Sequence, residues 1–160
     1  GSLRIYLCKN ISSKKISRRV QKILKEEKIF GLDKISTYLK FKKKVDKVKK
    51  DSLNFINKCN FEKKNIFAYG AAAKGATFLN YLQIKEKNIK YVFDASKFKI
   101  KKFLPASHIP ILSPRDIIKT KPDYILILPW NLSKEISAQL KFVKKWKCKF
   151  VTLVPKIKFF

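Results

Sequence analysis

Hydrophobic residues recur every three or four positions through the first third of the chain, which is the period of an amphipathic helix. One stripe predicts a helix that begins after Ser12 or Ser13, either of which can cap its amino end, and that ends at Gly31. A second stripe predicts a longer helix between residues 35 and 59, whose other face is filled with lysines exposed to solvent. The two stripes consist of Ile16, Val20, Ile23 and Leu24, and of Ile35, Tyr38, Phe41, Val45, Val48, Ser52, Ile56 and Cys59.

From residue 65 onward the pattern changes to short apolar runs that alternate with helical segments. This alternation predicts βαβ units with right-handed crossovers and a parallel sheet. The expected fold is therefore α/β, a Rossmann-like parallel sheet of about five strands over residues 65–160, with a helical arm over residues 9–64 in front of it. A further short strand is predicted at residues 3–7. The five sheet strands are expected at residues 65–69, 90–94, 109–112, 123–128 and 149–154, and the helices at 76–83, after Ser113-Pro114, and at 133–145.

The net charge of the chain changes this picture less than the magnitude of that charge suggests. A net charge of +28 on 160 residues first indicates nucleic-acid binding. Only four of the 39 basic residues are arginine, however, although arginine is the residue best suited to bidentate phosphate and base contacts. The abundance of Lys together with Ile, Asn and Phe is typical of A/T-rich coding. Nucleic acid is thus not the expected partner, and a lysine-rich nucleic-acid-binding module is kept as the alternative function.

The cysteines and the hydropathy place the chain in a broad class. Cys8, Cys59 and Cys148 are too widely spaced for a disulfide framework or a zinc site, which favours reduced and mostly buried thiols in a cytoplasmic protein. No apolar run approaches 18 residues, and the amino end has no signal-peptide core, so neither a membrane span nor a membrane partner is expected.

The best candidate site is the loop between Gly70 and Gly75, which joins a strand to a helix. Glycine allows a sharp turn after the strand, the alanines around Ala72 keep the approach open, and the start of the helix offers unpaired N–H groups to an anion. Lys74 adds a full positive charge where a phosphate would lie. The spacing matches neither the Walker loop nor the dinucleotide fingerprint. A tight structural turn therefore explains the spacing as well as anion binding does.

Three further segments carry candidate side chains. Asp94 ends the second strand, where an acidic residue can take ribose hydroxyls or simply form a turn. His108, the only histidine, is expected beside the carboxyl edge of the sheet and is more often structural than catalytic in such a position. Trp130 and Asn131 follow the fourth strand, where they can stack on and hydrogen-bond a ligand, or pack and cap the next helix. No catalytic triad, metal cluster or carboxylate pair is recognisable.

Several of these segments together resemble one family. The stretches "AYGAAAKGATFLNY", "LPASHIPI", "PDYILILPWN" and "KFVTLVP", with Asp94 and Lys99 between the first two, are similar to the C-terminal domain of the sugar C-methyltransferases. The resemblance covers residues 65–155 in order, and "GSLRIY" resembles the last strand of that family's central domain. Two positions depart from it, because Lys101 and Ala106 stand where the family often has glycine. These departures bear on the shape of that loop and, through it, on the sugar specificity.

The resemblance implies a function that the residues alone do not. Enzymes of that family use S-adenosylmethionine to methylate a carbon of a nucleotide-linked, commonly dTDP-linked, deoxysugar. Residues 1–8 would then end a preceding methyltransferase domain, which together with a zinc-binding module would hold the cofactor and the catalytic groups. This chain would position the substrate and be inactive alone. A third hypothesis is a dinucleotide-binding oxidoreductase domain. The resemblance implies that Gly70, Lys74, Gly75, Trp130 and Asn131 face the substrate; Ala72, Asp94 and His108 complete the predicted substrate-binding set.

Overall fold

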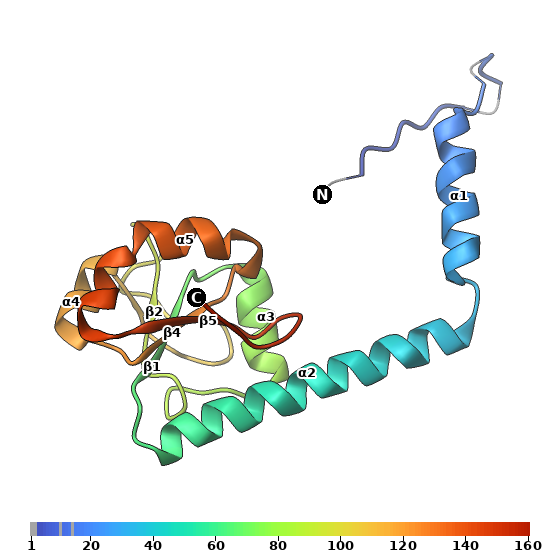
Figure 1. The fold of residues 1–160 in the computed structure, drawn as a ribbon. Helices are drawn as coiled ribbons and strands as arrows, with labels where there is room; N and C mark the ends of the chain where they lie inside the picture. The colour runs from blue at the N-terminus through green and yellow to red at the C-terminus, as the bar shows by residue number, and fades with distance from the viewer. Residues whose placement is uncertain (1–2, 10, 14) are drawn as a thin grey trace. The chain divides into compact units, whose positions relative to one another are not determined.

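A computed structural model describes residues 3–9, 11–13 and 15–160 of the chain (Figure 1). The chain forms two compact units, Gly1–Lys43 and Lys44–Phe160, and the boundary between them falls within one long helix. Each unit is described separately. No helix among the described residues is both long enough and apolar enough to cross a membrane.

The first unit contains the first of the two predicted arm helices. Helix α1 spans Arg18–Phe30 and ends, as predicted, at Gly31, whose left-handed backbone (φ 82°) lets its amide donate to the carbonyls of Glu27 and Lys28. The predicted caps Ser12 and Ser13 are wrong. Ser17 caps the helix instead, because its backbone is extended and its hydroxyl accepts a hydrogen bond from the amide of Arg19 at 3.2 Å.

The predicted strand at residues 3–7 does not form. Residues 3–9 have no regular secondary structure, since a strand exists only where a neighbouring strand accepts and donates its backbone hydrogen bonds. Helix α2, Ile35–Phe61, is the second arm helix and extends from the first unit into the second.

The second unit is built on one six-stranded sheet with the order β3-β2-β1-β4-β5-β6. The first five strands in the sequence run parallel to one another, as predicted, and the chain crosses from one side of β1 to the other between β3 and β4. This is the order of a Rossmann-like sheet. A sixth strand, which the sequence did not predict, pairs antiparallel with β5. The strands are β1 Ile66–Tyr69, β2 Val92–Phe93, β3 Ile111–Leu112, β4 Tyr124–Ile127, β5 Lys149–Thr152 and β6 Lys158–Phe159.

Helices cover both faces of the sheet (Figure 1). The side chains of β1 alternate, so that Ile66 and Ala68 pack under α2 and α3 (Ala73–Tyr81), whereas Phe67 and Tyr69 pack on the opposite face. That face is covered by α4 (Ile117–Thr120), α5 (Ser133–Gln139) and the 3₁₀ segment η3 (Lys141–Trp146). The helix predicted at residues 133–145 is therefore divided into α5 and η3. Two further 3₁₀ turns, η1 (Pro114–Asp116) and η2 (Trp130–Leu132), precede α4 and α5.

The loop between β2 and β3 contains three non-glycine residues in the left-handed region. Lys101 has φ 66°, Ala106 φ 62° and His108 φ 57°. Lys101 and Ala106 are the two positions where the similar family often has glycine. The backbone thus keeps a conformation that suits glycine although the side chains have changed, and each side chain costs on the order of 1 kcal/mol of steric strain.

We therefore expect Lys101→Gly and Ala106→Gly each to raise the free energy of unfolding by about 0.5–1 kcal/mol, because glycine relieves the steric cost of positive φ. Lys102→Gly is the matched control: Lys102 is equally exposed but is not in the left-handed region, so the change should destabilise. Urea unfolding of the three variants measures the effect. A loss of stability in all three would contradict the strain argument.

Candidate functional site

The loops that follow β1 and β4 lie together at the carboxyl edge of the sheet. These two strands are neighbours, and their connections lead to opposite sides of the sheet, which is the position where open α/β sheets bind ligands. The amide of Gly70 donates to the carbonyl of Phe93 at 2.8 Å, and the amide of Leu128 donates to the carbonyl of Tyr69 at 3.0 Å. The predicted loop is thus anchored to the strands on both sides of β1.

Both glycines of the loop are required by close packing against the segment after β4. Gly70 has φ 88°, and a Cβ atom there would lie 2.5 Å from Cδ of Pro129. A Cβ atom on Gly75 would lie 2.6 Å from Cβ of Leu128. These distances are too short for real atoms, so close packing requires glycine at both positions. The same packing brings the start of α3 to the end of β4.

Helix α3 begins earlier than the sequence predicted, at Ala73 rather than residue 76, so Lys74 and Gly75 belong to its first turn. Ala72 occupies the N-cap position with an extended backbone, and it has no side chain that could cap the helix. Within the described residues, the amides of Ala73, Lys74 and Gly75 have no hydrogen-bond acceptor. They leave three donors and the positive end of the helix dipole at the edge of the sheet.

Lys74 joins this helix start to the segment after β4. Its Nζ donates a hydrogen bond to Oδ1 of Asn131 and lies 4.8 Å from the centroid of the Trp130 ring. The alternative that Asn131 caps the following helix is not realised, because α5 has no side-chain cap. Three predicted residues from two distant segments, Lys74, Trp130 and Asn131, therefore meet in one cluster.

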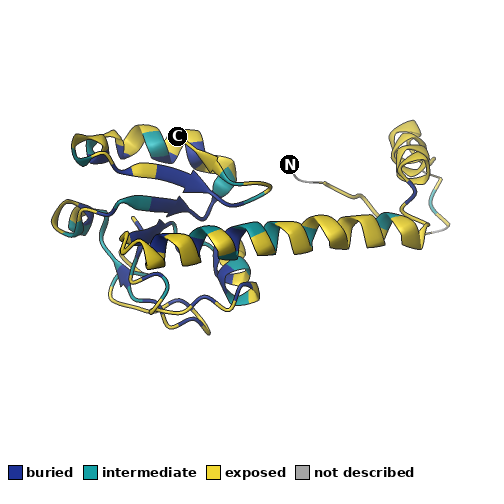
Figure 2. Ribbon diagram, turned by 60° about the horizontal axis from the view of Figure 1, so that its bottom comes forward, coloured by how far each residue is buried: buried dark blue, intermediate teal, exposed yellow. Residues whose placement is uncertain are grey.

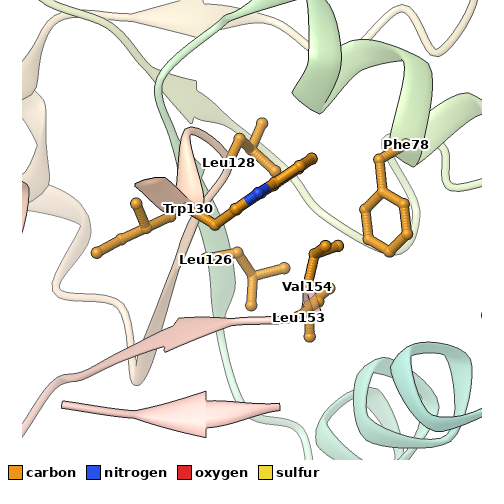
Figure 3. A pocket seen from close by; sticks show the side chains of 7 residues that line it. Phe78, Leu126, Leu128, Trp130, Leu153 and Val154 are labelled. Carbon is orange, nitrogen blue, oxygen red and sulfur yellow. The ribbon is translucent and has the colours of Figure 1, made fainter. Parts of the chain in front are cut away.

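Trp130 is half-buried, and its ring contacts two different groups. On one side its ring meets Phe78 edge to face, with the centroids 6.3 Å apart, above an apolar crevice of about 10 Å³ (Figure 3). That volume is about one probe sphere and admits no sugar or base. Trp130 thus packs, and it also presents its ring to the Lys74 ammonium. The crevice is lined by Phe78, Leu126, Ile127, Leu128, Trp130, Leu153 and Val154.

Asp94 fastens the loop from the other side. Only 8% of the residue is exposed, and its Oδ2 accepts a hydrogen bond from the amide of Ala71 at 2.7 Å. Oδ1 accepts one from the amide of Ser96 at 2.8 Å, and the Lys99 ammonium lies 3.4 Å from Oδ2. Asp94 acts as a turn residue and as a positioning group for the loop. Its predicted contact with a ribose stays a prediction.

His108 does not join the other candidates, and its expected place at the carboxyl edge is wrong. It lies just before β3, which runs parallel to β2, so it belongs to the amino edge of the sheet. Its loop is held there by Asn80 Nδ2, which donates to the carbonyl of Pro105 at 3.2 Å, and by Lys85 Nζ, which donates to that of Ala106 at 2.5 Å. The chain after β2 turns back across the sheet, which the sequence did not reveal.

Two titratable groups near the sheet, Tyr69 and Cys148, are held neutral by burial. Burial, and then the negative charge of Asp94, raises the pKa of Tyr69. Burial, and then Asp123, raises the pKa of the Cys148 thiol to about 12, so this buried thiol stays protonated. Among the residues that the structure describes, no three His, Cys, Asp or Glu side chains gather as metal ligands. The site is suited to binding, through amides, one ammonium and an aromatic ring.

These features define a class of protein. It is a Rossmann-like domain in which a loop with glycine and lysine leads into a helix at the point where the strand order crosses over. The chain belongs to a family described as the C-methyltransferase C-terminal domain, which matches residues 1–155. It is similar to the C-methyltransferase NovU of Streptomyces niveus, with 27% identity over 155 residues. The match covers 97% of this chain and 37% of the relative, so the chain spans little more than a third of that protein's length.

A solved structure also resembles the chain, but only distantly. UDP-D-quinovosamine 4-dehydrogenase from Vibrio fischeri has 20% sequence identity and a TM-score of 0.40, and the match covers 56% of this chain and 76% of that one. A similarity of this size does not bear on function.

Sequence reasoning missed two contributors to the site. Phe78 supports the Trp130 ring, and the signal was available, because it lies four residues after Lys74 on the same face of a helix. Leu128 sets how closely α3 approaches β4. That contact has no sequence signal, since it depends on which strands become neighbours.

We expect Gly75→Ala to lower the free energy of unfolding by about 1–2 kcal/mol, because overpacking against Leu128 outweighs the better helix propensity of alanine. Thr77→Ala, an exposed change in the same helix, serves as the control and should have a small effect. Chemical denaturation measures both. A more stable Gly75→Ala protein would show that α3 does not lie this close to β4.

Proposed function

We propose that this chain is the C-terminal, substrate-positioning domain of an S-adenosylmethionine-dependent C-methyltransferase that acts on a nucleotide-linked deoxysugar, with dTDP as the nucleotide. One observation carries the proposal: a chain of the C-methyltransferase C-terminal family has three unpaired helix amides and the Lys74 ammonium together at its strand crossover. These groups suit a pyrophosphate, which needs several donors and positive charge.

The neighbouring side chains suit the rest of such a ligand. Trp130 is half-exposed and offers a ring face for stacking on a base or sugar. In the free domain Lys74 is held by Asn131 and by this ring. A phosphate would take over the ammonium and release the Asn131 amide for a hydroxyl of the ligand. The loop itself stays fixed, because Asp94 holds Ala71 and Gly70 packs on Pro129.

The proposal assigns S-adenosylmethionine, which supplies the methyl group, to a part of the protein outside this chain, because the family is that of a C-terminal domain and the groups at this edge suit a phosphate. The residues described here contribute orientation, which can lower a barrier by several kcal/mol without taking part in bond making. The three cysteines are free, in keeping with a cytoplasmic enzyme.

Replacing Lys74 with alanine should weaken the binding of a dTDP-hexose by about 10- to 100-fold, because a charge-assisted contact to phosphate is worth about 1.5–3 kcal/mol. Trp130 lies beside Lys74, so a titration followed by tryptophan fluorescence at physiological salt measures the dissociation constant. The matched control is Lys85→Ala, which removes an exposed lysine at the amino edge of the sheet.

The competing ligands in the same titration are a short DNA duplex and S-adenosylmethionine. The proposal predicts saturable sugar-nucleotide binding that Lys85→Ala leaves unchanged. DNA binding that declines steeply with salt, without sugar-nucleotide binding, would instead support the lysine-rich nucleic-acid module. Equal losses in both lysine variants would mean that the ligand responds to overall charge and not to this site.

A further inference from the structure

One aromatic side chain at the carboxyl edge of the sheet is almost fully exposed. Most strand residues of the second unit are buried, whereas much of the helix surfaces and loops around them is exposed (Figure 2). Phe98, in the loop between β2 and β3, is 85% exposed. Among the large apolar residues described in that unit only Phe61 is more exposed, and Phe61 ends α2 just before β1, at the amino edge. A single exposed phenylalanine needs no explanation by itself, so the position of Phe98 decides its role.

A short turn connects Phe98 to the candidate site. The amide of Lys99 donates to the carbonyl of Ser96 at 3.0 Å, which closes a turn around Phe98. The amide of Ser96 donates to Asp94 at 2.8 Å, and the Lys99 ammonium lies 3.4 Å from the same carboxylate. Asp94 also accepts the amide of Ala71 at 2.7 Å. One carboxylate therefore holds both this turn and the loop after β1, which leads two residues later into the free amides of α3.

The strand order places Phe98 and Trp130 on opposite sides of that loop. Strand β1 lies between β2 and β4, so the loop from Gly70 to Gly75 is in the middle, with the turn after β2 on one side and the segment after β4 on the other. Neighbouring strands lie about 4.8 Å apart, so the ends of β2 and β4 are separated by about 10 Å. Aromatic rings thus flank a central group of anion donors. A nucleotide-linked sugar has the same order, because its pyrophosphate joins a base at one end to a sugar at the other.

We propose that Phe98 stacks on the base of the nucleotide-linked sugar and that Trp130 contacts its hexose. The inference rests on the proposed function and adds the orientation of the ligand. In Rossmann-like folds the nucleoside end of a nucleotide lies at the carboxyl end of β2, where the turn with Phe98 begins. An exposed aromatic ring stacks on the face of a base. Asn131, next to Trp130 in η2, suits hydroxyl groups, which the hexose carries and the base does not.

Phe98→Ala should weaken the binding of dTDP and of a dTDP-hexose by the same factor, about 5- to 100-fold, because it removes the stacking on the base. Inorganic pyrophosphate, which has no base, should bind with unchanged affinity. Isothermal titration calorimetry of the 160-residue chain with these three ligands measures the dissociation constants. Phe98→Tyr retains a ring and should retain the affinity.

The matched control is Phe103→Ala. Phe103 is also exposed, at 60%, but it forms a β-bridge with Pro110 ahead of β3, away from the carboxyl edge. Its replacement should leave the affinity for all three ligands unchanged.

Three results would overturn the proposal. Unchanged affinity of Phe98→Ala for dTDP would leave Phe98 without a ligand contact. A loss confined to the dTDP-hexose would put the hexose at this end, and an equal loss for pyrophosphate would mean that the substitution disturbs the loop itself. A failure of the proposed function looks different. The unsubstituted chain would then bind neither nucleotide, or would bind both without dependence on Lys74, and the orientation would fall with it.

Discussion

The arrangement of the site depends on how closely α3 approaches the end of β4. That approach is possible only because Gly75 lacks a side chain beside Leu128, and because Gly70 lacks one beside Pro129. With these two contacts in place, the first turn of α3 presents its free amides at the strand crossover, and Lys74 reaches Trp130 and Asn131 from a segment more than fifty residues away. The glycines are structural in their contacts, and the binding surface is a consequence of the packing they permit.

Much of the fold could be predicted from the sequence, because each element has a local signal. The alternation of apolar runs with helical stripes located all five parallel strands and their Rossmann-like class, and Gly31 marked the end of α1. The errors came where the outcome depends on partners distant in the sequence. Residues 3–7 have the composition of a strand but pair with no other strand in the described part of the chain, and β6 forms only because β5 offers an edge.

In the candidate site, too, features with a local sequence signal could be predicted, and contacts that depend on distant segments could not. Gly70, Lys74, Trp130 and Asn131 were identifiable because each follows a predicted strand, and parallel strands bring their carboxyl ends to one edge. His108 was misplaced because the chain after β2 turns back through left-handed residues that lack the glycines which usually mark such turns. The hydrogen bond from Ala71 to Asp94, which fixes the loop, could not be predicted either, since it depends on the exact ends of two neighbouring strands.

The central claim is that the start of α3 and the segment after β4 form one anion-binding surface for a nucleotide-linked sugar. Two-dimensional ¹⁵N–¹H NMR of the chain, titrated with a dTDP-hexose, tests it most directly. The account predicts that the amides of Ala73, Lys74 and Gly75 and the indole N–H of Trp130 shift together along one saturation curve, while the amides around His108 stay unchanged. Shifts spread over the lysine-rich surface that vanish with added salt, or shifts confined to the amino edge, would contradict it.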